Sequence, residues 1–170
     1  RPENRRNLVT LSAAHRFPFV VDGMRSEVVN RMAANKNSPE SANHVFPEDM
    51  LTEISCVKDV LAGSFGLMIF QEQFVEIVRR LSGWDYLTSE LYRYRVKKDG
   101  ATMELQDEFL QEARKEVALS ESQEQQLRML VARSPSAILR SHQIAYASIG
   151  WMMAYLKANY SVMFTGESRQ

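Results

Sequence analysis

The fold is decided by the stretch GLMIFQEQFVEIVRRLSG, residues 66–83. Its second half carries apolar side chains at helical spacing on one face, at Phe70, Phe74, Ile77 and Leu81. Acidic and basic side chains fall on the other faces, which is the pattern of an amphipathic helix that packs against a core. Gly83 ends the pattern, because glycine readily adopts the left-handed conformation that closes helices. The stretch therefore predicts a helix that is buried along one side.

The same periodicity continues on both sides of this stretch. Before it, Pro47-Glu48-Asp49 places a proline and two acids at a helix start, where the missing N–H and the helix dipole favour them. Ser120 with Gln123 forms the pattern of a capping box, which opens another helix. Including that one, the further helices are predicted over residues 47–63, 89–97, 103–117, 120–132 and 141–160. The predicted fold class is mainly α.

The first 45 residues lack this regularity. Prolines and a glycine interrupt them, and residues 35–43 form a polar run typical of an exposed loop. We expect a short helix over residues 26–34, and short strands are conceivable only at residues 17–21 and 67–70. The prediction is an irregular segment 1–45 that packs on a helical domain 46–170, one domain overall and a piece of a longer chain.

Composition excludes several classes of protein. Among 170 residues, 21 Lys and Arg balance 21 Asp and Glu, so no global positive field would hold nucleic acid. One cysteine, Cys56, excludes a disulfide framework and a cysteine-rich zinc site, and it fits a reducing, cytoplasmic compartment. No apolar stretch approaches the roughly 20 residues that span a bilayer. Since no Asp-x-Asp pair, His-Glu-x-x-His zinc motif or phosphate-binding glycine motif occurs, we expect no catalytic residue and no cofactor in this segment.

Two groups of residues are candidates for binding phosphate. The first is a cationic run with interleaved tyrosines, comprising Arg93, Arg95, Lys97 and Lys98. Guanidinium and ammonium groups bind phosphate oxygens, and tyrosines stack on bases. The alternative is a solvated helix end, where cations offset the helix dipole.

The second group opens the last predicted helix, where Arg140, Ser141 and His142 are followed one turn later by Tyr146. A helix N-terminus presents free N–H groups and partial positive charge, so it suits an anion. Alternatively, Ser141 caps the helix and His142 is partly buried. We expect Arg93, Arg140, His142 and Tyr146 to converge on one cleft. The aromatic and methionine residues 151–160 predict that this last helix is central to the core.

Six segments resemble, in order and spacing, the signatures of bacterial C-family replicative DNA polymerases, the alpha subunit of DNA polymerase III. The family patterns are YG-(apolar)-YQEQ, LAGY, DLLRR, FxxGA, SHxxxY and AYLKAHYPxxF. They correspond in that order to Gly66–Gln73, Leu81–Trp84, Glu90–Arg93, Phe109–Ala113, Ser141–Tyr146 and Ala154–Tyr160. The likeness is fainter upstream, at Arg1-Pro2 and at residues 29–31.

The resemblance implies the helical fingers domain of such a polymerase, which contacts the triphosphate of an incoming dNTP and the template DNA. Motif matching implies nucleotide contacts for Arg93, His142 and Tyr146. Contacts with nucleic acid are implied for Arg95, Lys97, Lys98, Arg140 and Lys157. The resemblance also implies that the parent protein is a DNA-directed DNA polymerase. Its palm domain would hold the metal-binding aspartates and their magnesium. This segment alone would not extend a primer. Implied partners are template-primer DNA, dNTP, the palm and other replisome subunits.

Several positions depart from the family pattern. Tyr94 stands in place of the second arginine of DLLRR, and Glu112 replaces a glycine. The pattern GYGFNKSH corresponds to Ser134–His142, where both glycines are missing, and Ser161 replaces the proline after Tyr160. These departures leave open an accessory or error-prone polymerase. They also leave open a noncatalytic helical interaction module with a degenerate nucleotide pocket.

Overall fold

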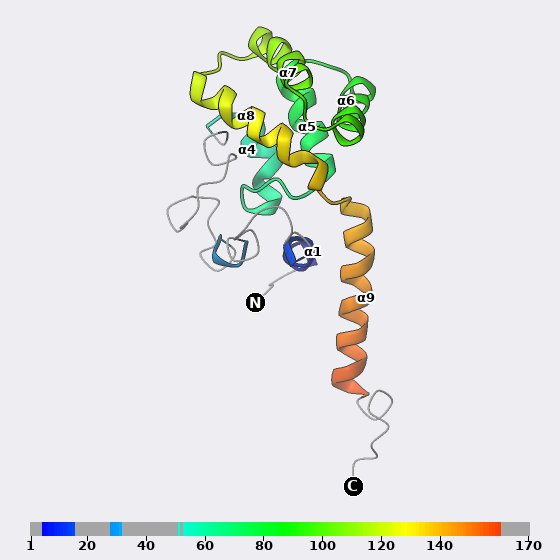
Figure 1. The fold of residues 1–170 in the computed structure, drawn as a ribbon. Helices are drawn as coiled ribbons and strands as arrows, with labels where there is room; N and C mark the ends of the chain where they lie inside the picture. The colour runs from blue at the N-terminus through cyan, green and yellow to red at the C-terminus, as the bar shows by residue number, and fades with distance from the viewer. Residues whose placement is uncertain (1–4, 16–27, 32–50, 52, 161–170) are drawn as a thin grey trace.

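The computed structural model describes residues 5–15, 28–31, 51 and 53–160 (Figure 1). Its helices are α1 Arg5–His15, α4 Ser55–Leu61, α5 Gln71–Ser82, α6 Tyr86–Asp99, α7 Met103–Glu116, α8 Glu121–Arg133 and α9 Arg140–Asn159. Short 3-10 turns, η2 Ala62–Ser64 and η3 Ser134–Ser136, follow α4 and α8. In these described ranges the only β pairing is an isolated parallel bridge between Phe70 and Ile138. The mainly α class is confirmed.

Local signals in the sequence set most helix ends. Gly83 closes α5 in the left-handed conformation, with φ 70°. Ser120 and Gln123 form the predicted capping box of α8. Helix α6 begins three residues earlier than expected, because the Asp85 carboxylate accepts a hydrogen bond from the Thr88 backbone N–H at 2.7 Å. This N-cap fixes the start of the helix before Ser89.

The N-terminal region is more regular than the sequence indicated. Residues 5–15 form helix α1, although the prolines around it predicted an irregular segment. Residues 28–31 are helical, within the short helix expected at 26–34. The predicted strand at residues 17–21, the loop at 35–43 and Pro47 itself lie outside the described residues. The single helix predicted over 47–63 is wrong, because α4 begins only at Ser55, after the extended backbone of Ile54. The division at residue 45 stays a prediction.

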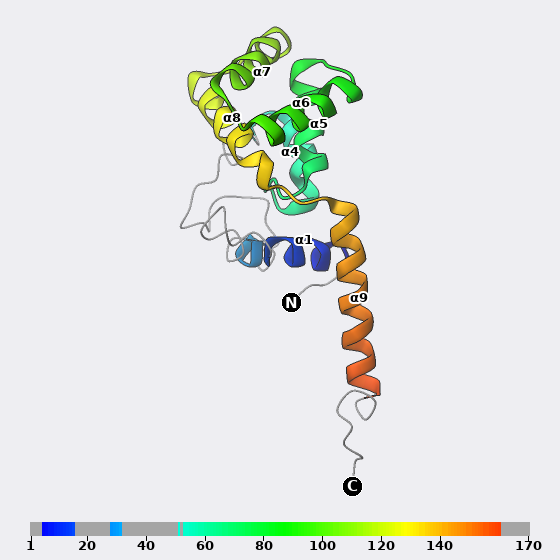
Figure 2. The same ribbon diagram turned by 45° about the vertical axis from the view of Figure 1, so that its right-hand side comes forward.

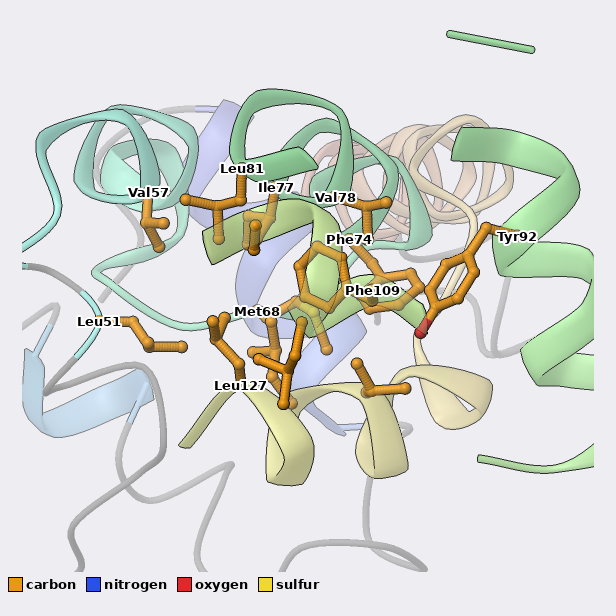
Figure 3. Packing of buried hydrophobic residues seen from close by; sticks show 14 of the residues in the cluster. Leu51, Val57, Met68, Phe74, Ile77, Val78, Leu81, Tyr92, Phe109 and Leu127 are labelled. Carbon is orange, nitrogen blue, oxygen red and sulfur yellow. The ribbon is translucent and has the colours of Figure 1, made fainter. Parts of the chain in front are cut away.

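The main core lies where α5 is surrounded by α4, α6, α7 and α8. The predicted apolar face of α5 is buried there, and Phe74, Ile77 and Leu81 have no exposed surface. Tyr92 of α6 packs against Phe74 and Phe109, whose ring centroids lie 6.2 Å and 5.9 Å from its own (Figure 3). The Tyr92 hydroxyl donates a hydrogen bond to the Leu105 carbonyl at 2.8 Å, which satisfies its one polar atom in this core.

Helix α9 runs away from this helical body in both views (Figure 2). Its first turns contact α1, where Ala147 packs against Val9 and Ala13. Beyond them the side chains are exposed, and Trp151 shows 60% of its surface. The expectation that α9 is central to the core is therefore wrong within the described structure. Its apolar composition predicted burial, but the neighbouring helices end before its second half.

Candidate functional site: the junction of α5, α6 and α9

Helices α5 and α9 begin side by side. The Gln71 backbone N–H donates to the Ile138 carbonyl at 2.9 Å, and the Ile138 N–H donates to the Ile69 carbonyl at 3.0 Å. These two hydrogen bonds hold the residues that precede α5 against those that precede α9. As a result, two helix N-termini, each with partial positive charge, lie close together.

Three consecutive polar residues at the start of α5 organise this junction. Gln73 is 2% exposed, and its side-chain oxygen accepts from the backbone N–H groups of Ile69 and Phe70 at 2.9 and 3.0 Å. Its amide nitrogen donates to the Ser64 hydroxyl at 2.5 Å and to the Val60 carbonyl at 3.3 Å. Gln73 thereby ties α5 to α4 and η2, and it supplies the acceptor for the buried N–H groups of Ile69 and Phe70.

Gln71 connects α6 to the segment that leads into α9. Its side-chain nitrogen donates to the Ala137 carbonyl at 2.7 Å, and its side-chain oxygen accepts from Arg93 Nη1 at 3.2 Å. Because both polar ends of the Gln71 amide are engaged, the Arg93 guanidinium is held near the start of α9. This connection orients the first of the predicted nucleotide-binding residues.

Glu72 caps the start of α9. Its two carboxylate oxygens lie 2.9 and 3.1 Å from the Arg140 backbone nitrogen, which donates to them. The carboxylate also sits in the first turn of α5. A negative charge at a helix start offsets the positive end of the dipole, so one side chain stabilises two helices.

Arg93 is mostly enclosed at this junction, with 16% of its side chain exposed. Glu90, one turn earlier on α6, accepts from both Nε and Nη2, the latter at 2.6 Å. The Glu90 hydrogen bond is the main cause of a raised pKa at Arg93, and the nearby charge of Glu72 adds to it. Arg93 is therefore held in one position, and the Glu90 carboxylate balances its charge.

The other cations of α6 differ in their pairing. Arg95 makes two 2.8 Å hydrogen bonds to the Glu108 carboxylate on α7. Lys97 and Lys98 are exposed, and no carboxylate within the described ranges pairs with them. Lys97 follows Arg93 by four residues and therefore lies on the same face of α6.

The predicted residues of α9 are spread along and around the helix. His142 and Tyr146 lie together, with ring centroids 4.6 Å apart. At about 100° per residue, Arg140 points roughly 160° away from His142. Lys157 lies about 25 Å along the axis from Arg140, given a rise of about 1.5 Å per residue.

Arg140 instead stacks on Phe70, with the guanidinium carbon 4.8 Å from the ring centroid, and lines a pocket beside α1. Of the four residues expected to share one cleft, Arg140 is the one that lines this pocket.

Sequence reasoning missed the polar residues that assemble the junction, Gln71, Glu72 and Gln73. The available signal was three polar residues in a row at the start of an otherwise apolar helix face. Across residues 5–15, 28–31, 51 and 53–160, no three His, Cys, Asp or Glu side chains gather closely enough to hold a metal ion. None of the helices described has the length and apolar character to cross a membrane.

Comparison with known proteins identifies the class. A family model described as "Bacterial DNA polymerase III alpha subunit finger domain" matches residues 1–117, and the chain belongs to this family. The mainly α fold agrees with that assignment.

Curated relatives support the same assignment. The chain is similar to a DNA polymerase III subunit alpha of Rickettsia bellii, 33% identical over 118 residues, which is 68% of this chain and 10% of that protein. A protein of the same name from Treponema pallidum is 26% identical over 64% of this chain and 10% of its own length. The match to the Staphylococcus epidermidis protein covers 96% of this chain, at 22% identity, and 14% of that protein. The chain thus spans about a tenth of the length of these relatives.

Proposed function

We propose that this finger domain contacts the phosphates of an incoming dNTP and of template DNA within a DNA-directed DNA polymerase. Arg93, His142 and Tyr146 would contact the nucleotide. The DNA contacts would come from Arg95, Lys97, Lys98, Arg140 and Lys157. The observation that carries the proposal is the anchoring of Arg93 beside the start of α9, through Gln71 and the Ala137 carbonyl.

A guanidinium that the fold already holds in one orientation is suited to binding polyphosphate. The conformational entropy of its side chain is lost when the protein folds, so it is not lost again when the ligand binds. Arg93 presents planar N–H donors next to a helix N-terminus, a combination that favours phosphate oxygens. Glu90 competes with phosphate for these donors. Removal of the Glu90 charge should therefore strengthen binding, whereas removal of the Arg93 charge should weaken it.

Lys97 and Lys98 would supply the salt-sensitive part of DNA binding. Each is an exposed point charge that binds backbone phosphates without reading the sequence. Tyr94, exposed between them and Arg93, offers a ring on which a base can stack. Arg95 is held by Glu108 and would contribute less to binding than either lysine.

The test is binding of a fluorescent single-stranded oligonucleotide, and separately of dNTP, over a range of salt concentrations. We expect Arg93→Ala to weaken dNTP binding about tenfold, since a charge-assisted hydrogen bond contributes about 1.5–3 kcal/mol. Glu90→Gln should tighten it. Lys97→Ala should reduce the slope of log affinity against log salt by about 1.

Arg114→Ala is the matched control, because Arg114 is also paired with a carboxylate, Glu124 on α8, but lies outside the junction. If Arg93→Ala and Lys97→Ala bind as this control does, the cations of α6 form only a solvated surface. A loss of affinity in Glu90→Gln would mean that the ion pair supports the fold rather than restrains the ligand.

A second candidate function, that of a helical interaction module, is favoured by the exposed half of α9. Trp151 and Tyr155 stack there at 5.7 Å, beside exposed Met152 and Met153. Adjacent exposed apolar side chains on one helix are a feature of protein–protein interaction sites. We propose that this half packs against the palm domain of the parent polymerase, since the matched segment makes up only 10% of the length of the Treponema pallidum relative.

Fluorescence can test that packing, because the chain contains two tryptophans and Trp84→Phe leaves Trp151 as the reporter. A blue shift on addition of a palm domain from a relative is expected. An unchanged spectrum would exclude this partner.

A further inference from the structure

Helix α6 carries apolar side chains on two opposite faces. Tyr92 and Val96 face the core and are buried there. Leu87, Leu91 and Tyr94 are instead each more than half exposed. At about 100° per residue, these two sets lie roughly 150° apart around the helix axis. One face therefore builds the core, whereas the other is exposed in the described part of the chain.

The exposed face has the residue spacing of a helix-pairing seam. Leu87, Leu91, Tyr94 and Lys98 follow one another at intervals of four, three and four residues. We call these four residues the outer face of α6. Apolar side chains at this alternating spacing lie along one side of a helix, where they pack against a partner helix. Tyr94 stands in place of the second arginine of the DLLRR pattern, so the apolar character of this face departs from the family pattern.

Two opposite charges flank the outer face along the same edge. Glu90 and Lys97 are seven residues apart, so they lie on nearly the same side of α6, two turns from each other. The Lys97 ammonium is exposed, and no carboxylate within the described ranges pairs with it. Glu90 binds Arg93, but 37% of the Glu90 side chain remains exposed. A second α6 that lies antiparallel to the first would bring its own Lys97 to Glu90 and its own Glu90 to Lys97.

We propose that two copies of this chain pair through the outer faces of their α6 helices, which run antiparallel. Leu91 of each copy packs against Tyr94 of the other copy. The aliphatic stem of Lys98 covers Leu87 of the other copy while its ammonium stays in water. These contacts remove apolar surface of both chains from water, which stabilises the pair.

The flanking charges select a second copy of this chain as the occupant. In the antiparallel arrangement, Glu90 of each copy forms an ion pair with Lys97 of the other copy. The order of chemical groups along the helix is thus complementary to its own reverse. A two-fold symmetric interface requires such self-complementarity, because each contact occurs twice with the two copies exchanged.

The outer face is small, since it spans about three turns of one helix. Interfaces below the standard size associate weakly and transiently. We therefore expect a dimer that forms at protein concentrations of about 10 μM to 1 mM.

This proposal does not depend on the proposed contacts with nucleotide and DNA. Arg93 lies on a different side of α6, roughly 130° around the axis from the outer face. Tyr94, Lys97 and Lys98 also belong to the proposed DNA-binding surface, so self-association is measured without DNA. The two properties then have separate readouts, and failure of one proposal does not decide the other.

Sedimentation velocity of the whole chain over this concentration range measures the self-association. Leu91→Asp should weaken it at least about tenfold, because the substitution places a carboxylate in the apolar seam. Met152→Asp is the matched control, since Met152 is also exposed but lies on α9. This control should associate as the wild-type chain does. Melting curves followed by circular dichroism verify that both variants are folded.

Charge exchange tests the antiparallel orientation. Glu90→Lys and Lys97→Glu each bring like charges together at both symmetric contacts, so each variant alone should associate about tenfold more weakly. An equimolar mixture of the two variants restores opposite charges and should regain this tenfold. The control is a mixture of Glu112→Lys and Lys115→Glu, an exposed ion pair on α7, which should gain nothing on mixing.

The proposal is overturned if the wild-type chain sediments as a monomer over the whole concentration range. It is also overturned if Leu91→Asp associates as the wild-type chain does, or if mixing the two charge-exchanged variants gives no gain. Loss of association in Met152→Asp would place the contact on α9 and would equally overturn it.

Discussion

The Glu72 carboxylate accepts a hydrogen bond from the Arg140 backbone N–H, with both oxygens within 3.1 Å of the nitrogen. The two residues are 68 positions apart, so this contact joins the start of α5 to the start of α9. It leaves the Arg140 side chain available to lie over Phe70 and line the pocket beside α1. One acidic residue thus fixes the point from which α9 leaves the helical body.

Glu72→Ala should lower the free energy of unfolding by about 1 kcal/mol, the usual cost of losing an N-terminal cap. Glu72→Gln should cost less, because one acceptor oxygen remains. Urea unfolding followed by circular dichroism measures both changes. Glu112→Ala is the control, since Glu112 pairs with Lys115 on an exposed surface and should change stability by less than about 0.5 kcal/mol. If the substitutions at Glu72 and Glu112 lower the free energy of unfolding equally, Glu72 does not act as a cap.

Gln73→Leu should destabilise the domain by about 3 kcal/mol or more. The substitution keeps a side chain of similar size but leaves the buried N–H groups of Ile69 and Phe70 without their acceptor. Gln125→Leu, at an exposed position on α8, is the matched control and should be nearly neutral. Chemical denaturation measures the free energy of unfolding of the two variants. A loss below about 1 kcal/mol in Gln73→Leu would contradict the stabilising role of the Gln73 hydrogen bonds.

Tyr92→Phe should cost about 1–2 kcal/mol, because the Leu105 carbonyl loses its buried donor while the ring packing is kept. Tyr94→Phe provides the control on the same helix, since Tyr94 is 56% exposed. Thermal unfolding at neutral pH should separate the two variants by roughly 3–6 °C. Coinciding transitions would show that the Tyr92 hydroxyl contributes nothing measurable.

Alkaline stability should also depend on Tyr92. Burial, with a smaller contribution from the Glu108 charge, raises the pKa of the Tyr92 hydroxyl above its ordinary value of 10.0. A raised folded pKa means that the associated stability is complete below pH 10 and is lost as the pH rises towards the folded value. The wild-type chain should therefore lose stability above pH 10 more steeply than Tyr92→Phe, in unfolding curves measured from pH 8 to 11.

Acid stability should depend on Glu76. Hydrogen bonds from Arg79 and then Arg80 hold the pKa of the Glu76 carboxyl at about 2, against an ordinary value of 4.5. A lowered folded pKa gives stability that is present above pH 4.5 and lost as the pH falls towards 2. Because both arginines are partly exposed, we expect only about 1 kcal/mol from this source. Glu76→Gln should flatten the acid limb of stability against pH, and an acid limb as steep as that of the wild-type chain would contradict this contribution of Glu76.

Sequence alone determined the helices that build the main core. Hydrophobic periodicity, the glycine after α5 and the capping box of α8 are local signals, since each depends on side chains within a few residues of one another. They gave the mainly α class and placed α5, α7, α8 and α9 close to their observed bounds. The motifs that resemble the polymerase family are equally local, and the family assignment agrees with them.

Only the tertiary structure decided which residues meet. The partner of a polar side chain depends on the path of the whole chain, so the links from Gln71 to Arg93 and from Glu72 to Arg140 have no local signal. The same holds for α9, whose apolar composition predicted burial although nothing described packs around its second half. The surroundings of the Arg140 side chain also depend on the packing of α1, η2 and Phe70. Helical periodicity predicts which residues share a face of a helix, but it does not predict what that face contacts.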